Sequence, residues 1–311
     1  MRGLKGQESG RMGMRVLKFV LFCFTSFACF CGAGNPDYRM EGFSSRYLKR
    51  KVPISLHVPT REVLAAWKAA NPNVRGRLIL FLPGAYDGPK DLIRYGIYTH
   101  VAQSESAQLI APALWVSVTH YKSWYADRQD GSFPYEKFLL EELIPEIEKR
   151  FPDFGGSAEF RTVAGLSMGG FGALNLCGRT NLFTRCAALS PALVEPPFNN
   201  AGWLVGRSLK RTFPMEAEAF APWNPFKHFG GTAELYLGCG TEDKYGLAPT
   251  TKTFAELARK RGRAVTLDLR PGNHNWDYWA PEFKRLVPWL HGGTPPAQPT
   301  ALKMQQSAKT M

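Results

Sequence analysis

The chain has 311 residues, of which 44% are hydrophobic and 21% charged, and a formal net charge of +13. This balance excludes disorder along the whole chain, and the 30 glycines and 23 prolines show no collagen-like period. The length fits one large α/β domain or two smaller ones. Residues 1–33 and 293–311 carry six of the net charges, which leaves +7 for the remainder. No basic run with interleaved aromatics occurs there, so no nucleic-acid partner is predicted.

The N-terminal segment has the pattern of an export signal. Residues 14–33 start with basic residues, continue with a short apolar stretch to Cys31, and end in small residues. This order is typical of a secretory signal peptide, with cleavage predicted near Ala33. The apolar stretch is short for a membrane span, so no stable span is expected in the mature form, although an uncleaved anchor remains an alternative. A secreted or periplasmic protein is therefore predicted.

The rest of the chain divides into a domain over residues 34–292 and a disordered tail over residues 293–311. The domain holds three cysteines, Cys177, Cys186 and Cys239, in apolar surroundings. An odd number cannot form a full disulfide framework, so buried thiols are expected. No cysteine or histidine pair has zinc-ligand spacing. We therefore predict neither a metal nor a cofactor.

Short apolar runs alternate with amphipathic segments throughout this domain. Strands are predicted over 52–58, 78–82, 114–119, 160–164, 187–189, 234–237 and 265–269. Helices are predicted over 138–151, 168–177 and 250–261, with a kink at Pro145. The continuous apolar run Leu78–Leu82 indicates a strand buried on both faces. This alternation predicts an α/β fold with a mostly parallel central sheet and helices on both faces.

Residues 191–230 interrupt the alternation with a segment rich in proline and aromatic residues. Such an insert could cap a binding cleft, or it could be an elaborate connection packed on the core. The sequence leaves both interpretations open.

A candidate nucleophile lies in the motif Gly165-Leu166-Ser167-Met168-Gly169-Gly170. Gly-x-Ser-x-Gly alone is weak, but here it follows a predicted strand and opens a helix whose first residues are small. A sharp strand-to-helix turn needs small neighbours, and it projects the serine hydroxyl beyond the carboxyl end of the sheet. The helix N-terminus directs N–H groups toward developing negative charge. Ser167 is therefore predicted to be a nucleophile.

A nucleophilic serine needs a base, and the base needs an orienting acid. In this arrangement both follow the serine along the chain. The histidines that do so are His228, His274 and His291. We favour His274, because it lies in a loop directly after a predicted strand. Asp243 is favoured over Glu242 as the acid, because the two carboxylates follow the preceding strand and its turn.

An oxyanion hole is expected from two backbone N–H groups. One is that of Met168, directly after the nucleophile, and the other is that of Ala85, in the loop after the strand at 78–82. Gly84 would let this loop approach the substrate closely.

These motifs resemble the esterase D family of α/β-hydrolases. The similarity spans roughly residues 52–290 and includes Ser123–Asp127, Glu141–Pro145, Gly240–Asp243 and His274-x-Trp276. The family includes secreted carbohydrate esterases, feruloyl esterases, S-formylglutathione hydrolases, enterochelin esterases and mycolyltransferases of the antigen 85 type. The resemblance implies the α/β-hydrolase fold and a serine–histidine–acid mechanism.

Two positions depart from the family pattern. Pro83-Gly84 stands where the family usually has His-Gly, and Asn275 stands where Asp often follows the catalytic histidine. The stretch around Trp124 is similar to a loop that borders the active site in small-ester hydrolases of the family. The candidate substrate-binding residues are Tyr86, His120, Trp124, Tyr125 and Trp276.

Together these features predict an exported serine carboxylesterase that forms an acyl-enzyme. Its substrate would be a small-molecule or glycan ester carrying an acetyl, feruloyl or other small acyl group. One alternative is an acyltransferase of the mycolyltransferase type, which would use the same three residues. Another is a non-catalytic glycan-binding module on the same fold.

Overall fold

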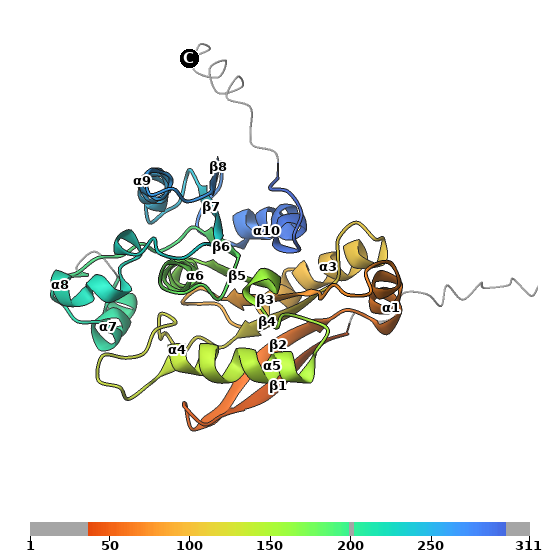
Figure 1. The fold of residues 1–311 in the computed structure, drawn as a ribbon. Coiled ribbons are helices and arrows are strands. Elements are labelled where there is room, and N and C mark those ends of the chain that lie inside the picture. Colours follow the sequence, from red (N-terminus) through yellow and green to blue (C-terminus); the bar gives the residue numbers. More distant parts are fainter. Residues whose placement is uncertain (1–36, 199–201, 297–311) are drawn as a thin grey trace, which may run out of the picture. The chain divides into compact units, whose positions relative to one another are not determined.

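The computed structural model describes residues 37–198 and 202–296, and Figure 1 shows how their elements are arranged. The predicted signal peptide over residues 1–33 lies outside the described residues, as does the predicted tail from residue 297 on. None of the described helices is both long enough and apolar enough to cross a membrane.

The core of the fold is an eight-stranded sheet in the order β1-β2-β4-β3-β5-β6-β7-β8. Its strands are β1 (Asp37–Ser45), β2 (Arg50–Val58), β3 (Arg77–Leu82), β4 (Ala113–Val118), β5 (Arg161–Leu166), β6 (Arg185–Leu189), β7 (Glu234–Gly240) and β8 (Val265–Arg270). β2 pairs antiparallel with β1 and β4, and every other pair in this sheet is parallel. The predicted mostly parallel sheet is confirmed, and β1 is an addition to the predicted strands.

Helices cover the sheet on both faces. They are α1 (Arg61–Ala70), α2 (Asp91–Arg94), α3 (Ile97–Ser106), α4 (Tyr135–Lys137), α5 (Ile144–Arg150), α6 (Met168–Arg179), α7 (Trp203–Thr212), α8 (Ala217–Phe220), α9 (Leu247–Lys260) and α10 (Trp276–Leu290). A π-helical stretch, Phe138–Leu143, joins α4 to α5 directly before Pro145. The irregularity expected at this proline therefore takes the form of a wider helical turn.

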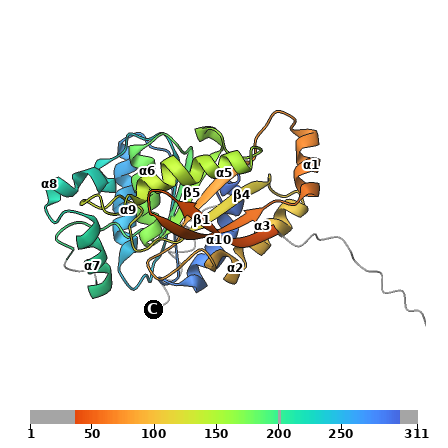
Figure 2. The ribbon, with the colours of Figure 1, turned by 90° about the horizontal axis from the view of Figure 1, so that it is seen from below.

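The strand β3 shows why two helical layers are needed. Leu78, Leu80 and Leu82 face a cluster that includes residues of α6 and α9, while Ile79 and Phe81 face a cluster that includes residues of α3 and α10. Figures 1 and 2 show α6 and α10 on opposite sides of the sheet. All five side chains are at most 2% exposed, which confirms a strand buried on both faces.

The described parts of the insert, residues 191–198 and 202–230, pack on this core through apolar side chains, most of them aromatic. Leu209, Phe213 and Phe220 are fully buried and belong to the cluster on the α6 face. This packing favours the interpretation as an elaborate connection. Trp203 and Leu204, at the start of α7, point away from the core and are exposed.

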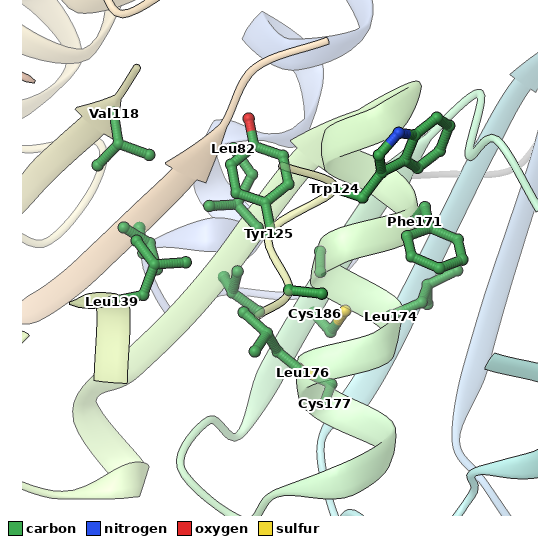
Figure 3. Packing of buried hydrophobic residues seen from close by; sticks show 14 of the residues in the cluster. Leu82, Val118, Trp124, Tyr125, Leu139, Phe171, Leu174, Leu176, Cys177 and Cys186 are labelled. Carbon is green, nitrogen blue, oxygen red and sulfur yellow. The ribbon is translucent and has the colours of Figure 1, made fainter. Parts of the chain in front are cut away.

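The three cysteines of the domain are buried free thiols, as predicted. Cys177 of α6 and Cys186 of β6 lie in the packed cluster that Figure 3 shows. Burial raises the pKa of the Cys177 thiol and, to about 12, that of Cys239.

Candidate active site

Ser167 occupies the sharp turn between β5 and α6. Its backbone adopts φ 54° and ψ −117°, a region that residues with a side chain rarely occupy. The turn is held by hydrogen bonds from the Ser167 N–H to the Leu189 carbonyl (2.8 Å) and from the Ala192 N–H to the Ser167 carbonyl (3.0 Å). The strained conformation is thus fixed by neighbouring backbone, and the hydroxyl projects from the carboxyl end of the sheet.

Gly169 shows why this turn requires small residues. A Cβ built on Gly169 would lie 1.7 Å from the Leu82 carbonyl oxygen. The first turn of α6 therefore lies directly against the end of β3, and only glycine fits at this contact. This agrees with the small-residue requirement inferred from the motif.

His274 bridges the serine and a carboxylate. Its Nε2 lies 3.0 Å from Ser167 Oγ, and its Nδ1 lies 2.7 Å from Asp243 Oδ2. The rings of Tyr245 and Trp279 pack edge-on against the imidazole, and each ring centroid lies 4.8 Å from that of His274. These contacts fix the plane of the imidazole. The structure thus brings together the three residues that the sequence singled out.

Asp243 sets the tautomer of the histidine. Its Oδ1 accepts a hydrogen bond from the Tyr245 N–H (3.0 Å), while Oδ2 accepts from the imidazole and from the Cys239 thiol (3.8 Å). Burial alone would raise the pKa of Asp243. The hydrogen bond and charge of His274, together with hydrogen bonds from the Tyr245 and Leu247 N–H groups, outweigh it, so the pKa lies below the ordinary value. An ionised Asp243 keeps the proton on Nδ1, and Nε2 is then free to accept the serine proton. Glu242, the alternative acid, is exposed.

The other two histidines after the nucleophile are engaged elsewhere. His228 Nε2 lies 2.7 Å from the Ala221 carbonyl. His291 is buried between the Trp115 indole N–H and the Ala111 carbonyl. Of these three histidines, His274 is the one hydrogen-bonded to the serine.

The loop after β3 lies beside the nucleophile. A Cβ built on Gly84 would lie 2.6 Å from the Leu166 side chain and 3.4 Å from Ser167 Cβ, so the loop backbone touches the turn. Within the part of the chain that the structure describes, the N–H groups of Ala85 and Met168 have no protein acceptor. Both are therefore available to a carbonyl oxygen, as the predicted oxyanion hole requires.

Two of the predicted substrate-binding residues are buried in the core. Trp124 and Tyr125 are at most 1% exposed and pack near Phe171 of α6, as Figure 3 shows. The Tyr125 hydroxyl donates to the Pro83 carbonyl (2.6 Å), and the Trp124 indole donates to Ser208 Oγ (3.0 Å). Neither side chain presents a surface to a ligand here. Tyr125 supports the loop after β3, whereas Trp124 joins α6 to α7.

His120 also supports the loop. Its Nδ1 accepts from the Lys122 N–H (2.8 Å), so Nε2 carries the proton and donates to the Asp87 carbonyl (2.8 Å). Burial lowers the pKa of His120 to about 4, which keeps the ring neutral. Of the five predicted substrate contacts, Tyr86 has the most exposed ring (71%), with Lys122 Nζ 5.2 Å above it.

One residue at the site, Asp87, was not singled out from the sequence. The buried Trp276 donates its indole N–H to Asp87 Oδ1 (2.7 Å). The two residues lie 189 positions apart, and no sequence motif joins them. Among the described residues, no group of three or more His, Cys, Asp or Glu side chains is arranged to hold a metal ion.

This strand order, with a serine at the turn after a central strand and a histidine and carboxylate on later loops, defines a serine hydrolase of the α/β-hydrolase fold. The chain belongs to the esterase family whose model, described as "Putative esterase", matches residues 45–290. It is a hydrolase of carboxylic esters.

Individual relatives are distant. An acetyl esterase of Caldicellulosiruptor saccharolyticus is 24% identical over 184 residues, which cover 54% of this chain and 68% of that protein. A solved ferulic acid esterase is 20% identical with a TM-score of 0.64, over 83% of this chain and 99% of that one. An S-formylglutathione hydrolase of Staphylococcus aureus is 16% identical with a TM-score of 0.67, over 83% of this chain and 100% of that one. These structural similarities establish the common fold.

Proposed function

We propose that this protein is an exported serine carboxylesterase that removes acetyl, feruloyl or similar small acyl groups, including those carried on glycans. The observation that supports it best is the chain of hydrogen bonds from Ser167 through His274 to Asp243. It lies beside two N–H groups that can donate hydrogen bonds to a developing oxyanion. The acetyl esterase and ferulic acid esterase among the relatives support the choice of acyl groups.

The reaction follows from this geometry. Ser167 Oγ attacks the ester carbonyl carbon while its proton moves to His274 Nε2. The carbonyl oxygen becomes an oxyanion that accepts hydrogen bonds from the N–H groups of Ala85 and Met168. When it collapses, the bond to the leaving alcohol breaks, and the alcohol takes the proton from His274.

Water completes the cycle. It attacks the acyl group on Ser167, its proton passes to His274, and the carboxylic acid leaves as the serine is protonated again. Asp243 stays ionised throughout and stabilises the imidazolium that forms twice.

The test measures the hydrolysis of nitrophenyl acetate, a feruloyl ester and an acetylated oligosaccharide by the wild type and by Ser167→Ala. We expect hydrolysis by the wild type and a loss on the order of 10⁶ in kcat for the variant, with an unchanged unfolding midpoint. A fluorophosphonate should label the wild type at Ser167. A folded wild type that neither hydrolyses an ester nor takes the label would contradict the proposal.

A further inference from the structure

Asp87 joins three loops around the proposed site. Its carboxylate Oδ1 accepts from the Trp276 indole N–H (2.7 Å), and its backbone carbonyl accepts from His120 Nε2 (2.8 Å). Its own N–H donates to the Gly84 carbonyl (3.1 Å). This bond closes a turn in the loop after β3, residues 83–88, which we call the oxyanion loop. The residue therefore connects the loops that follow β3, β4 and β8.

Trp276 is a fixed donor for this carboxylate. It is the first residue of α10, two positions after His274, and only 8% of its side chain is exposed. Its ring stacks on Tyr95 with centroids 4.2 Å apart and planes 9° apart. Because the ring is held on its face as well as at its N–H, its position sets that of Asp87.

The other carboxylate oxygen lies against the backbone that carries the oxyanion donor. A Cβ built on Gly84 would lie 2.5 Å from Asp87 Oδ2 and 3.4 Å from Ser167 Cβ. Asp87 and the nucleophile thus pack around the same glycine. The peptide that follows Gly84 supplies the N–H of Ala85, so a shift of Asp87 would displace that donor.

We propose that Asp87 is a positioning residue, which sets the Ala85 N–H by tying the oxyanion loop to the start of α10, two residues after His274. This role rests on the proposed function. It requires a hydrogen-bond acceptor at Asp87 and a donor at Trp276, but it requires no charge. Asparagine in place of Asp87 can make the same contact, whereas alanine cannot.

The test is a double-mutant cycle on nitrophenyl acetate hydrolysis with Asp87→Ala and Trp276→Phe. Phenylalanine lacks the N–H but can still stack on Tyr95. Each single variant should lower kcat about 10- to 100-fold with KM changed less than about threefold, since misplacing a catalytic donor has effects of this size. The double variant should be no slower than the worse single variant, because both remove one contact.

Two further variants separate positioning from charge and from folding. Asp87→Asn should restore kcat to within about fivefold of the wild type. Asp277→Ala, which removes an exposed carboxylate next to Trp276, should hydrolyse the ester at the wild-type rate. Unfolding midpoints of all variants show whether each is folded, and Trp276→Phe and Asp87→Asn test the contact even if Asp87→Ala does not fold.

Three results would overturn the positioning role. These are a kcat of Asp87→Ala within threefold of the wild type, effects of the two single variants that multiply in the double variant, and an Asp87→Asn variant as slow as Asp87→Ala. A wild type that hydrolyses no ester would overturn the proposed function itself, and this role with it.

Discussion

The Tyr125 hydroxyl donates a 2.6 Å hydrogen bond to the carbonyl of Pro83, 42 residues earlier in the chain. Tyr125 is fully buried, and Gly172 of α6 leaves room for its ring, since a Cβ there would lie 2.6 Å from it. The oxyanion loop is therefore held from beneath at the position where proline replaces the usual histidine of the family.

We predict that Tyr125→Phe slows catalysis more than its effect on stability would suggest. The change leaves the Pro83 carbonyl without its donor, which should lower the free energy of unfolding by about 1 kcal/mol. The loosened loop should lower kcat about 3- to 10-fold, because the oxyanion donor it carries is less well placed. Urea unfolding and ester hydrolysis measure the two effects.

Tyr135→Phe is the matched control for that variant. Tyr135 is equally buried and packs edge-on against Tyr125, but its hydroxyl donates to the Thr119 carbonyl and makes no hydrogen bond to the oxyanion loop. It should lose similar stability while kcat stays within about twofold. Equal effects of the two variants on kcat would contradict a specific role for Tyr125.

Asp243→Asn should lower kcat by about 10⁴, as expected when the acid that fixes the tautomer is lost. Asparagine can keep the shape of the contact, but its amide favours the wrong proton position on His274. Glu242→Gln, one residue earlier and exposed, should stay within a few-fold of the wild type. Steady-state kinetics on one ester compare the two variants, and a slow Glu242→Gln with a fast Asp243→Asn would reverse the assignment.

The juxtaposition of Ser167, His274 and Asp243 could be predicted because each follows the carboxyl end of a strand. In a parallel sheet these ends lie at one edge, so the order of strands and loops along the chain was sufficient. The glycines after Ser167 also indicated the nucleophile, because the close contact of α6 with β3 requires small residues there.

The supports of the site could not be predicted in the same way. The contact of Trp276 with Asp87 joins residues 189 positions apart. The helical spacing of apolar residues that begins at Trp276 predicts a buried face, but it does not indicate which distant side chain accepts from the indole. Trp124 and Tyr125 were predicted from the family resemblance to contact substrate, but the sequence contains no sign of whether an aromatic side chain in a loop points outward or inward. Their burial depends on the packing of α6 and of residues 191–230, which are distant in sequence.

Gly169→Ala should destabilise the protein by about 3 kcal/mol or more, or prevent folding. The added methyl group would overlap the Leu82 carbonyl, and both groups belong to rigid elements that cannot separate cheaply. Gly88→Ala is the control, since a Cβ there meets no atom within 4 Å. Chemical unfolding of both variants tests this, and a stable Gly169→Ala would contradict the close contact of α6 with β3.

His291 should make the stability of the protein depend on pH between about 4 and 6.5. It is buried, its Nε2 accepts from the Trp115 indole (3.0 Å), and its Nδ1 donates to the Ala111 carbonyl (2.7 Å). A second proton on the imidazole would be bound at Nε2, where it would face the Trp115 indole N–H. Burial accordingly lowers the pKa of His291 to about 4.

The direction in which stability changes with pH follows from proton linkage. Between the folded value near 4 and the unfolded value of about 6.5, the unfolded chain binds the extra proton. Stability is therefore fully present above the unfolded pKa and falls as the pH drops toward the folded one, by up to about 1.4 kcal/mol per pH unit for this residue. His120, whose pKa is also lowered to about 4, adds a loss of the same sign.

Urea unfolding of the wild type and His291→Gln from pH 4 to pH 7 isolates this contribution. Glutamine stays neutral and can still hydrogen-bond, so the variant should lose less stability on acidification, with a slope near pH 5 that is smaller by about one proton. The variant is expected to be less stable than the wild type at pH 7, because its fit is poorer, and the two curves should converge as the pH falls. Parallel curves would show that His291 is not the group that titrates.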